Sequence, residues 1–441
     1  MGKKVILMTY EPIPKAKYGG PGRILTLIKQ YKATNPRRYA HIKILSILNL
    51  FLSRGTFLDK EKNREKWFVK NSRLNVKIIS KFRIIFNNLG KTPYFLREIL
   101  SLIYLYALIL IGSYCIIKAK SIFKNARVLH FHDVFSFWSF YTASLLSRDT
   151  RKIYKKVTKI LTLHSPGATF KEYGIAMRLR DSSLSCIILK QLERKAIVNS
   201  HALIFPSIYY TKHIINDLHL NLFKKDAKKK IYIVYNGIEG LLNLENFRPI
   251  KMTYKREVIN KLRLPCDVKY LILSAGRIIR LKGFDLLLKV AEQLYPRYGT
   301  RFFFLVIGDG PLLDELRKKS PPNMLFLGFV SEKLKRQLFL ACDIFVSPSR
   351  RSTFDLAILE AMSAGCAIVA TDSGGNVEAI SDAGIIVKTT VQDILRGLEK
   401  ILRNESLLHY YQSAAYIRFK NNFSIETMMS KLLRIYNEFF N

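Results

Sequence analysis

The stretch VSPSRRSTFDLAILEAMSAGCAIVATDSGGNVE, from Val346 to Glu378, predicts the fold of the second half of the chain. An apolar run over Asp343 to Ser347 predicts a buried strand that stops at a Pro-containing turn. Apolar residues then recur at helical spacing: Leu356, Leu359, Ala361 and Met362. Gly365 ends this pattern where a helix C-terminal cap belongs, and Ala367 to Ala370 predicts the next buried parallel strand. The stretch is therefore a βαβ unit, with polar loops at the strand ends where open parallel sheets bind ligands.

Glu360 lies inside the apolar helix of this unit. A buried carboxylate is costly unless it finds a partner. One interpretation is a side chain that reaches solvent or a local backbone group. The other is a carboxylate that holds a pair of ligand hydroxyls, as acidic residues in such folds hold ribose.

The segment resembles the donor site of the GT-B glycosyltransferases, in particular the large retaining family 4, whose pattern is P-S-x-x-E-G-F-G-L-x-x-L-E-A-M-A-x-G. Nine residues match it in register: Pro348, Ser349, Phe354, Leu356, Leu359, Glu360, Ala361, Met362 and Gly365. The departures include Ser352 in place of the first Glu and Asp355 in place of a Gly. The resemblance implies that Glu360 binds the nucleotide ribose and that Ser352, Phe354, Asp355 and Leu356 bind the donor. Ser352 can still bond a sugar hydroxyl, more weakly than a carboxylate would.

The composition predicts a folded protein of two domains. The chain has 441 residues, of which 49% are hydrophobic and 12% aromatic, enough for two separate cores. The five cysteines are scattered without a C-x-x-C pair, which favours reduced and buried thiols. The start, MGKKVILMTYEPIP, lacks the long apolar core of a signal peptide. We therefore expect a cytoplasmic protein.

The formal net charge of +40 suggests a partner. Nucleic acid, an anionic membrane surface and a general bias towards Lys are the candidates. No zinc-finger, KH or RRM signature accompanies the charge, so nucleic acid is the weakest of them and we expect no nucleic-acid partner.

A membrane partner gains support from Ile99 to Ile117, an uncharged segment of 19 residues. A buried or membrane-skimming helix ranks first, an interfacial anchor second and a transmembrane span last, because a core strand of the same domain follows. We expect a membrane-contacting helix over 95–121 and a peripheral position on the inner face of the membrane. A basic cluster at 148–159 is either a solvated face or a contact with anionic lipid heads, at about 1 kcal/mol per basic residue.

The N-terminal half begins with a predicted buried strand, Lys4 to Thr9, and its following loop contains Gly19 and Gly20. Glycines at this point let a backbone approach a ligand closely, although a flexible turn has the same composition. The loop resembles the Gly-Gly loop of the family, which implies that Gly20 lies on the donor side and Gly19 on the acceptor side. Ile42 to Leu48 predicts a second strand, whereas residues 55–92 are basic and stay unassigned.

Histidines end two further predicted strands of this half. Arg127 to His132 ends in His130 and His132, whose spacing of two places both imidazoles on one face. No further ligands with suitable spacing are visible, so we reject a metal site. A core histidine bonded to backbone is one interpretation; a similar V-x-H-x-H in the family implies instead that His132 lies near the reacting sugar and is catalytic. Ile160 to His164 is the second strand, and His164 is an acceptor-side candidate.

The boundary between the domains is predicted near residue 250. The turn Asn236-Gly237-Ile238, with Phe247 and Pro249 after it, resembles the interdomain linker of the family. We therefore predict an acceptor domain over 1–250, a donor domain over 251–420, and a C-terminal helix over 421–441 that returns to the first domain.

The second domain opens with Tyr270 to Ala275, a predicted buried strand, followed by Arg277 and Lys282 ahead of a helix from Phe284 to Leu294. Two cations at the carboxyl end of a strand, beside a helix N-terminus, favour a diphosphate. An exposed basic loop is the alternative in so basic a protein. The G-R-x-x-x-x-K-G spacing resembles the family signature, which implies that Arg277 and Lys282 act on the donor diphosphate as catalytic residues. Two more positions are implied near the nucleotide: Gly310 and Val330.

Taken together, the chain is predicted to be an α/β protein of the GT-B class, with two Rossmann-like domains that face each other across a cleft. The implied reaction moves a sugar from a nucleotide-diphosphate sugar to an acceptor hydroxyl, with retention of configuration. The sequence contains no D-x-D motif, which favours a metal-independent site, and no cofactor is expected. The charge and the apolar segment favour an acceptor that is a glycan, polyprenyl-linked or presented at an anionic membrane. The alternative function is a non-catalytic GT-B subunit that binds a nucleotide sugar; a sugar-nucleotide epimerase would need acidic catalytic groups that we do not find.

Overall fold

The structure, a computed structural model, describes residues 4–9, 21–47, 92–164, 168–219, 230–242, 248–352 and 354–440. The predicted loop glycines Gly19 and Gly20, and nearly all of the unassigned basic segment, lie outside these residues. The chain divides into two compact units: residues 1–206, 210–234 and 429–441 form unit 1, and residues 207–209 and 235–428 form unit 2. The long segment of unit 2 thus starts at Tyr235, whereas the boundary was predicted near residue 250. Ile238 pairs with Ser424 in a parallel bridge, which holds this segment in unit 2.

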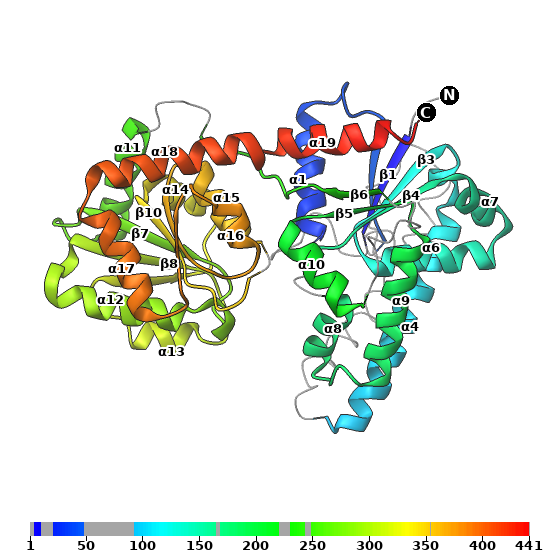
Figure 1. The fold of residues 1–441 in the computed structure, drawn as a ribbon, viewed down its shortest axis with the longest axis horizontal. Coiled ribbons are helices and arrows are strands. Elements are labelled where there is room, and N and C mark those ends of the chain that lie inside the picture. The colour runs from blue at the N-terminus through cyan, green and yellow to red at the C-terminus, as the bar shows by residue number, and fades with distance from the viewer. Residues whose placement is uncertain are drawn as a thin grey trace. The chain divides into compact units, whose positions relative to one another are not determined.

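Within the described residues, unit 1 contains a six-stranded parallel sheet in the order β2-β1-β3-β4-β5-β6 (Figure 1). The strands are β1 (Lys4–Thr9), β2 (Ile42–Ser46), β3 (Ala126–Phe131), β4 (Thr158–Thr162), β5 (Ala202–Phe205) and β6 (Lys230–Ile233). The predicted strands are therefore present, although β2 ends at Ser46 and the two histidine strands stop before His132 and His164. All except β6 are short and mostly buried apolar runs, as expected for strands covered on both faces.

Helices cover both faces of this sheet (Figure 1). They are α1 (Pro21–Thr34), α4 (Tyr94–Lys118), α5 (Lys120–Phe123), α6 (Val134–Leu146), α7 (Arg148–Lys156), α8 (Thr169–Met177), α9 (Leu184–Asn199) and α10 (Ile208–Asp217). The C-terminal helix α19 (Ile425–Asn437) begins in unit 2, and from Met429 on it belongs to unit 1, as the predicted fold requires. Tyr436 of α19 is fully buried in this unit.

The apolar segment predicted over 99–117 forms most of α4. One face of α4 packs in the core with α6 and α9 through Leu105, Ile109 and Ile116. The opposite face, here called the outer stripe of α4, is 39 to 67% exposed and consists of Phe95, Ile99, Ile103, Tyr106, Leu110 and Tyr114. By length and composition α4 is, among the described residues, the one helix that could cross a membrane, a test that core helices of soluble proteins also pass.

Unit 2 contains, in the part of the chain that is described, a second six-stranded parallel sheet in the order β12-β11-β10-β7-β8-β9. The strands are β7 (Tyr270–Ala275), β8 (Phe302–Ile307), β9 (Met324–Gly328), β10 (Ile344–Ser347), β11 (Ala367–Thr371) and β12 (Ile385–Val387). Of these, β7, β10 and β11 match the predicted apolar runs within one residue. The quoted stretch is thus a βαβ unit in which β10 and β11 pair in parallel.

Helices lie on both sides of this sheet as well (Figure 1). They are α11 (Arg248–Leu262), α12 (Phe284–Tyr298), α13 (Leu313–Lys318), α14 (Glu332–Ala341), α15 (Leu356–Ser363), α16 (Gly375–Ile380), α17 (Val391–Leu402) and α18 (Glu405–Asn422), with short 3-10 turns η2 (Arg280–Lys282) and η3 (Gly299–Arg301). The helix predicted to end at Leu294 continues for one more turn, through Pro296. Gly365 follows α15 with a φ of 63°, as its predicted capping role requires.

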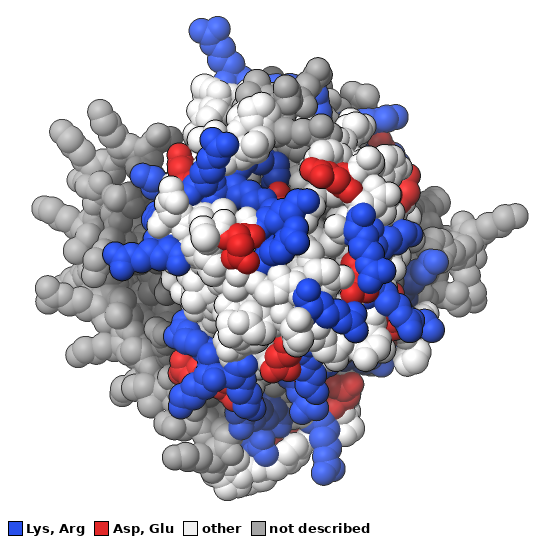
Figure 2. All heavy atoms as spheres, turned by 90° about the vertical axis from the view of Figure 1, so that its left-hand side faces the viewer, with Lys and Arg blue, Asp and Glu red and all other residues white. Residues whose placement is uncertain are grey.

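The excess of positive charge is not gathered into one patch on the face seen in Figure 2. Lys and Arg side chains are spread over that face, and fewer Asp and Glu side chains lie among them.

Candidate functional site

The two sheets each have a topological switch point, where ligands bind in open α/β sheets. In unit 2 the chain runs from β7 outwards to β8 and β9, and then returns to place β10 on the other side of β7. The switch point therefore lies between the carboxyl ends of β7 and β10. The loop after β7 carries Arg277 and Lys282, and the loop after β10 carries Ser352 and Asp355. Two loops far apart in the sequence thus meet at one edge of the sheet.

These two loops are fixed to each other. The guanidinium of Arg350 donates to both carboxylate oxygens of Asp285, at 2.6 and 2.7 Å, and to the carbonyl of Arg280 at 2.7 Å. Gly283 has a φ of +70°, and a Cβ on it would lie 1.9 Å from the carbonyl oxygen of Pro348. Only glycine fits such a contact, so the Lys282-Gly283 pair of the predicted signature has a structural reason.

Lys282 is already paired with a carboxylate. Its ammonium donates to Asp355, and the two side chains are 24% and 20% exposed. Asp355 also accepts hydrogen bonds from Asn376 Nδ2 at 3.1 Å and Ser349 Oγ at 3.3 Å. Burial opposes ionisation, but Lys282 and these polar neighbours together hold the pKa of the Asp355 carboxyl below its ordinary value. The loop thus holds an ionised carboxylate at a residue where the family pattern has Gly.

The other predicted diphosphate residue is in a different state. Arg277 is exposed and, within the described residues, has no ion pair. Gly310 and Val330 are half-buried in the loops after β8 and β9. The loops after β7 and β8 are joined, since the amide of Ile278 donates to the carbonyl of Asp309 at 2.9 Å. These predicted residues therefore belong to the same sheet edge, and their donor roles stay predictions.

Glu360 satisfies its charge through a lysine, which neither sequence interpretation named. Lys335 of α14 donates to Glu360 at 3.1 Å and also pairs with Glu332 at 2.8 Å. Glu360 keeps 13% of its side chain exposed. The carboxylate can therefore exist in the helix without a ligand, and its ribose role stays a prediction.

The remaining donor candidates of the quoted stretch are Phe354, Ser352 and Leu356. Phe354 is buried and packs among aromatic rings, at 6.0 Å from Tyr235 and 5.8 Å from Phe423, which is a core position. Ser352 is 8% exposed, and its hydroxyl lies 3.5 Å from Asn376 Oδ1. Leu356 starts α15 and is half-buried.

Asn376 is the residue that the sequence reasoning missed. Its side chain donates to Asp355 through Nδ2 and accepts from the amide of Asp355 through Oδ1 at 3.0 Å. It is fully buried, although asparagine is mostly exposed in proteins. Its place directly after Gly374-Gly375, past the end of a buried strand, was the available signal.

In unit 1 the switch point lies between β1 and β3, because β2 and β3 flank β1. His132 follows β3, and its amide donates to the carbonyl of Met8 in β1 at 2.8 Å. Thr9 Oγ1 donates to Asp133 Oδ2 at 2.8 Å across the same strands. His132 therefore occupies the sheet edge at which a ligand is expected.

Three histidines gather at this edge. Nδ1 of His132 lies 2.9 Å from Nε2 of His164, and the rings of His130 and His132 are 4.2 Å apart. Both nitrogens of His130 have partners, Tyr436 and Thr162, at 2.7 Å each. The interpretation as a core histidine fits His130 in its burial, but its partners are side chains and not the backbone that was expected. His132 Nε2 and His164 Nδ1 are buried and have no hydrogen-bond partner within the described residues.

All three imidazoles are neutral at physiological pH. Burial lowers the pKa of His130 to about 3 and that of His164 to about 4. Burial, followed by the neighbouring imidazoles, holds the pKa of His132 well below its ordinary value. In a neutral pair one ring must donate to the other, so the two free nitrogens comprise one N–H and one lone pair. Such a pair can both donate to and accept from a ligand hydroxyl.

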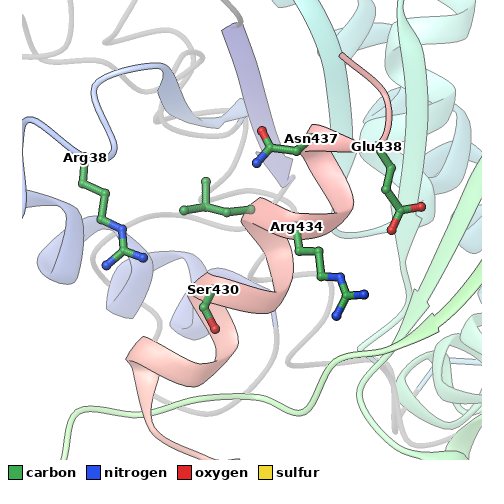
Figure 3. A pocket seen from close by; sticks show the side chains of 6 residues that line it. Arg38, Ser430, Arg434, Asn437 and Glu438 are labelled. Atoms are coloured by element: carbon green, nitrogen blue, oxygen red, sulfur yellow. The ribbon is translucent and has the colours of Figure 1, made fainter. Parts of the chain in front are cut away.

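No group of three His, Cys, Asp or Glu side chains within the described residues is arranged to hold a metal ion. An open pocket of about 500 Å³ lies elsewhere in unit 1, between the turn before β2 and the last turns of α19 (Figure 3). It is lined by Arg38, Ser430, Leu433, Arg434, Asn437 and Glu438. None of these residues was predicted to bind a ligand.

Comparisons with known proteins agree with this architecture. Residues 256–418 match the model of the family Glycosyl transferases group 1. An uncharacterized glycosyltransferase of Methanocaldococcus jannaschii is 26% identical over 218 residues, 47% of this chain and 54% of the relative. This chain thus spans about half the length of that relative. The N,N'-diacetylbacillosaminyl-diphospho-undecaprenol alpha-1,3-N-acetylgalactosaminyltransferase of Campylobacter jejuni is 32% identical over 171 residues, 38% of this chain and 44% of the relative.

The solved structure of HepE from Anabaena, in complex with UDP, aligns with a TM-score of 0.62 at 13% identity, over 99% of this chain and 100% of that chain. This likeness shows a shared fold of two parallel-sheet, Rossmann-like domains. Residues 256–418 thus resemble the Glycosyl transferases group 1 family, in a chain that shares the two-domain fold of this solved structure.

Proposed function

We propose that the chain is a glycosyltransferase that moves a sugar from a nucleotide-diphosphate sugar to an acceptor hydroxyl. The observation that carries the proposal is the placement of Arg277 and Lys282 at the switch point of the group 1 domain, where the loops after β7 and β10 are fixed together. Cations at this edge are suited to a diphosphate. The UDP found with HepE supports a nucleotide donor, and UDP-sugars are the first donor class to test.

The chemical step depends on the departing diphosphate. Negative charge grows on the nucleotide as the bond to the sugar breaks, and preorganised cations lower this barrier most effectively. In the proposed mechanism Arg277 and Lys282 meet that charge, together with the N-terminal amides of α15. Because protein cations do this work, the reaction is proposed to need no metal, and retention of configuration is proposed from the resemblance to family 4. Activity that disappears with EDTA and returns with Mg²⁺ would contradict the metal-independent mechanism.

A screen of UDP-, GDP- and ADP-sugars tests the proposal, with thermal unfolding and nucleotide release as readouts. One class of nucleotide sugar should raise the unfolding temperature of wild type, and wild type should slowly release the nucleotide from that sugar. The double variant Arg277→Ala with Lys282→Ala should lose both effects. The control variant carries Lys289→Ala and Lys318→Ala, which removes the same charge from exposed positions of α12 and α13. Stabilisation without release, also in the presence of membrane lipid extract, would favour the non-catalytic subunit. No response to any nucleotide would refute the proposal.

The acceptor is proposed to be a glycan on a polyprenyl or other lipid carrier. The name of the Campylobacter relative specifies a diphospho-undecaprenol acceptor. In this chain the outer stripe of α4 supports a membrane-presented acceptor, because exposed apolar side chains recur at helical spacing over five turns. α7 packs against α6, as α4 does, and carries five exposed cations: Arg148, Arg151, Lys152, Lys155 and Lys156. An apolar stripe with cations on a neighbouring helix suits the inner, anionic leaflet of a membrane.

Vesicle flotation tests this part. Wild type should float with vesicles that contain 30 mol% phosphatidylglycerol at physiological salt and much less with pure phosphatidylcholine. Ile103→Glu with Leu110→Glu, two positions of the outer stripe that are 53% and 55% exposed, should abolish flotation without changing nucleotide binding. Wild type that does not float with anionic vesicles would contradict the membrane role and leave the proposed sugar transfer untouched. Self-association of wild type that the double variant abolishes would assign the stripe to a second copy of the chain.

A further inference from the structure

The pairing of Lys282 with Asp355 raises a question that the proposed function leaves open. A lysine that meets a diphosphate should present its charge to the ligand, and here a carboxylate of the same unit already holds it. About a fifth of each side chain stays exposed, so a ligand can reach the pair. The pair is therefore accessible and replaceable, unlike a fully buried ion pair.

The position of the carboxylate is the second observation. Asn376 Nδ2 donates to Asp355 Oδ2, while Asn376 Oδ1 lies 3.5 Å from the hydroxyl of Ser352. A hydrogen bond from Ser352 also helps to lower the pKa of the Asp355 carboxyl. The carboxylate of residue 355 thus lies beside the side chain of residue 352, where the family pattern has its first Glu.

The surrounding loop holds the carboxylate in place. Gly374 has a φ of +61°, and a Cβ on it would lie 1.7 Å from the carbonyl oxygen of Ser352, so the two loops are in direct backbone contact. Ser349 and Asn376 are almost fully buried, and both donate to Oδ2 of Asp355. Asp355 can therefore lose Lys282 and still keep part of its hydrogen bonding.

We propose that Asp355 is the donor-site carboxylate of this protein, in place of the missing Glu at 352, and that the donor diphosphate takes Lys282 from it. The inference rests on the proposed function. On donor binding, the ammonium turns to the diphosphate, and hydroxyls of the sugar replace it as hydrogen-bond donors to Asp355. For a nucleotide-diphosphate sugar, the exchange replaces the hydrogen-bond donor that Asp355 loses by sugar hydroxyls. For the bare nucleotide diphosphate it leaves Asp355 facing the phosphates without new donors.

The site therefore discriminates a sugar nucleotide from the bare nucleotide. Loss of the carboxylate removes an anion that competes for Lys282, so it should strengthen binding of the bare nucleotide. The same loss removes charge-assisted hydrogen bonds to the sugar, so it should weaken donor use. These two effects have opposite signs, which a general loss of folding cannot produce.

The test uses calorimetric binding of UDP and of the UDP-sugar that wild type hydrolyses, together with turnover. Asp355→Asn should bind UDP about 3- to 10-fold more tightly and turn over about 10- to 100-fold more slowly. Glu399→Gln, which breaks an ion pair on α17 of the same unit, serves as the control for loss of one negative charge and should leave both unchanged.

Moving the carboxylate from residue 355 to residue 352 completes the test. Asp355→Gly should lose turnover, and Ser352→Glu combined with Asp355→Gly, which moves the carboxylate to the position of the first Glu in the family pattern, should recover most of it. Unchanged UDP affinity and turnover in Asp355→Asn, or a swap that stays inactive while circular dichroism shows it folded, would overturn the role of Asp355 and leave the proposed function standing. Wild type that binds no nucleotide would overturn both.

Discussion

Replacement of Glu193 by glutamine should change how the stability of unit 1 depends on pH. Glu193 lies in α9 and is fully buried. Its Oε1 accepts from the amide of Thr169 at 2.9 Å and from the hydroxyl of Thr169 at 2.6 Å, so it caps the N-terminus of α8 from another helix. Its Oε2 has no partner within the described residues. Burial raises the pKa of Glu193 to about 7, although the bonds from Thr169 oppose the shift.

The sign follows from proton linkage. In the unfolded chain the carboxyl has a pKa near 4.5, so between pH 4.5 and 7 the folded state binds more protons than the unfolded state. The free energy of unfolding therefore falls as the pH rises through this window, and the loss is complete above pH 7. A difference of roughly 2.5 pKa units gives a loss of about 2.5 kcal/mol between pH 5 and pH 8. Glu193→Gln has no such proton, so its free energy of unfolding should not fall in this way. The free energy of unfolding of the variant minus that of wild type should therefore be about 2.5 kcal/mol larger at pH 8 than at pH 5.

Urea unfolding followed by tryptophan fluorescence measures this difference. Both tryptophans of the chain precede residue 206, and Trp138 donates to the carbonyl of Leu192, next to Glu193. Thr169→Val removes one bond that stabilises the charged form, so it should make the pH dependence steeper than in wild type. A difference between wild type and Glu193→Gln that stays constant from pH 5 to pH 8 would refute the assigned pKa and the reasoning from burial.

Three further predictions concern the rest of the chain. Lys251 is 5% exposed and donates to the C-terminal carbonyls of α14 and α15 at 2.5 and 3.0 Å. Lys251→Met should therefore lower the free energy of unfolding of unit 2 in urea by about 2–4 kcal/mol. An unchanged urea midpoint would contradict this prediction. His164→Phe should slow turnover about 10- to 100-fold by removing the partner of His132, while His164→Gln, which keeps a polar atom near Nε2, should retain most of it. Equal losses of turnover in the two variants would assign His164 a packing role. The ¹⁵N chemical shifts of His132 should show a tautomer change in His164→Phe alone. Gly283→Ala should lower the melting temperature and abolish stabilisation by UDP, because its Cβ would collide with Pro348; normal UDP binding would show that the loop can move.

The sequence alone was sufficient for β7, β10 and β11 of the sheet of unit 2. The runs Tyr270 to Ala275 and Ala367 to Ala370 are apolar, and the structure gives the same limits within one residue. In unit 1 the ends of the strands were harder to predict from the sequence. His132 and His164 were predicted as the last strand residues, yet both lie just past the hydrogen-bonded ladder, because a side chain at the sheet edge leaves no trace in the apolar pattern.

Side-chain partners were beyond the sequence reasoning. The composition of α15 showed that Glu360 needed a partner, but Lys335 is 25 residues away on another helix. The motif placed Lys282 at a phosphate site, but its carboxylate partner Asp355 is 73 residues further along the chain. Such pairs form only when parallel strands bring their carboxyl-end loops together.

The sequence thus determined what is local: apolar runs, helix periods, glycines at tight turns, and cations after a strand. These follow from the chemistry of neighbouring residues, so they can be read in order along the chain. The tertiary structure decided which loops meet at each switch point, that three histidines share one sheet edge, and that Asp355 lies against Lys282 and beside Ser352. Burial and charge at these points depend on groups that are distant in sequence, and only the folded chain brings them together.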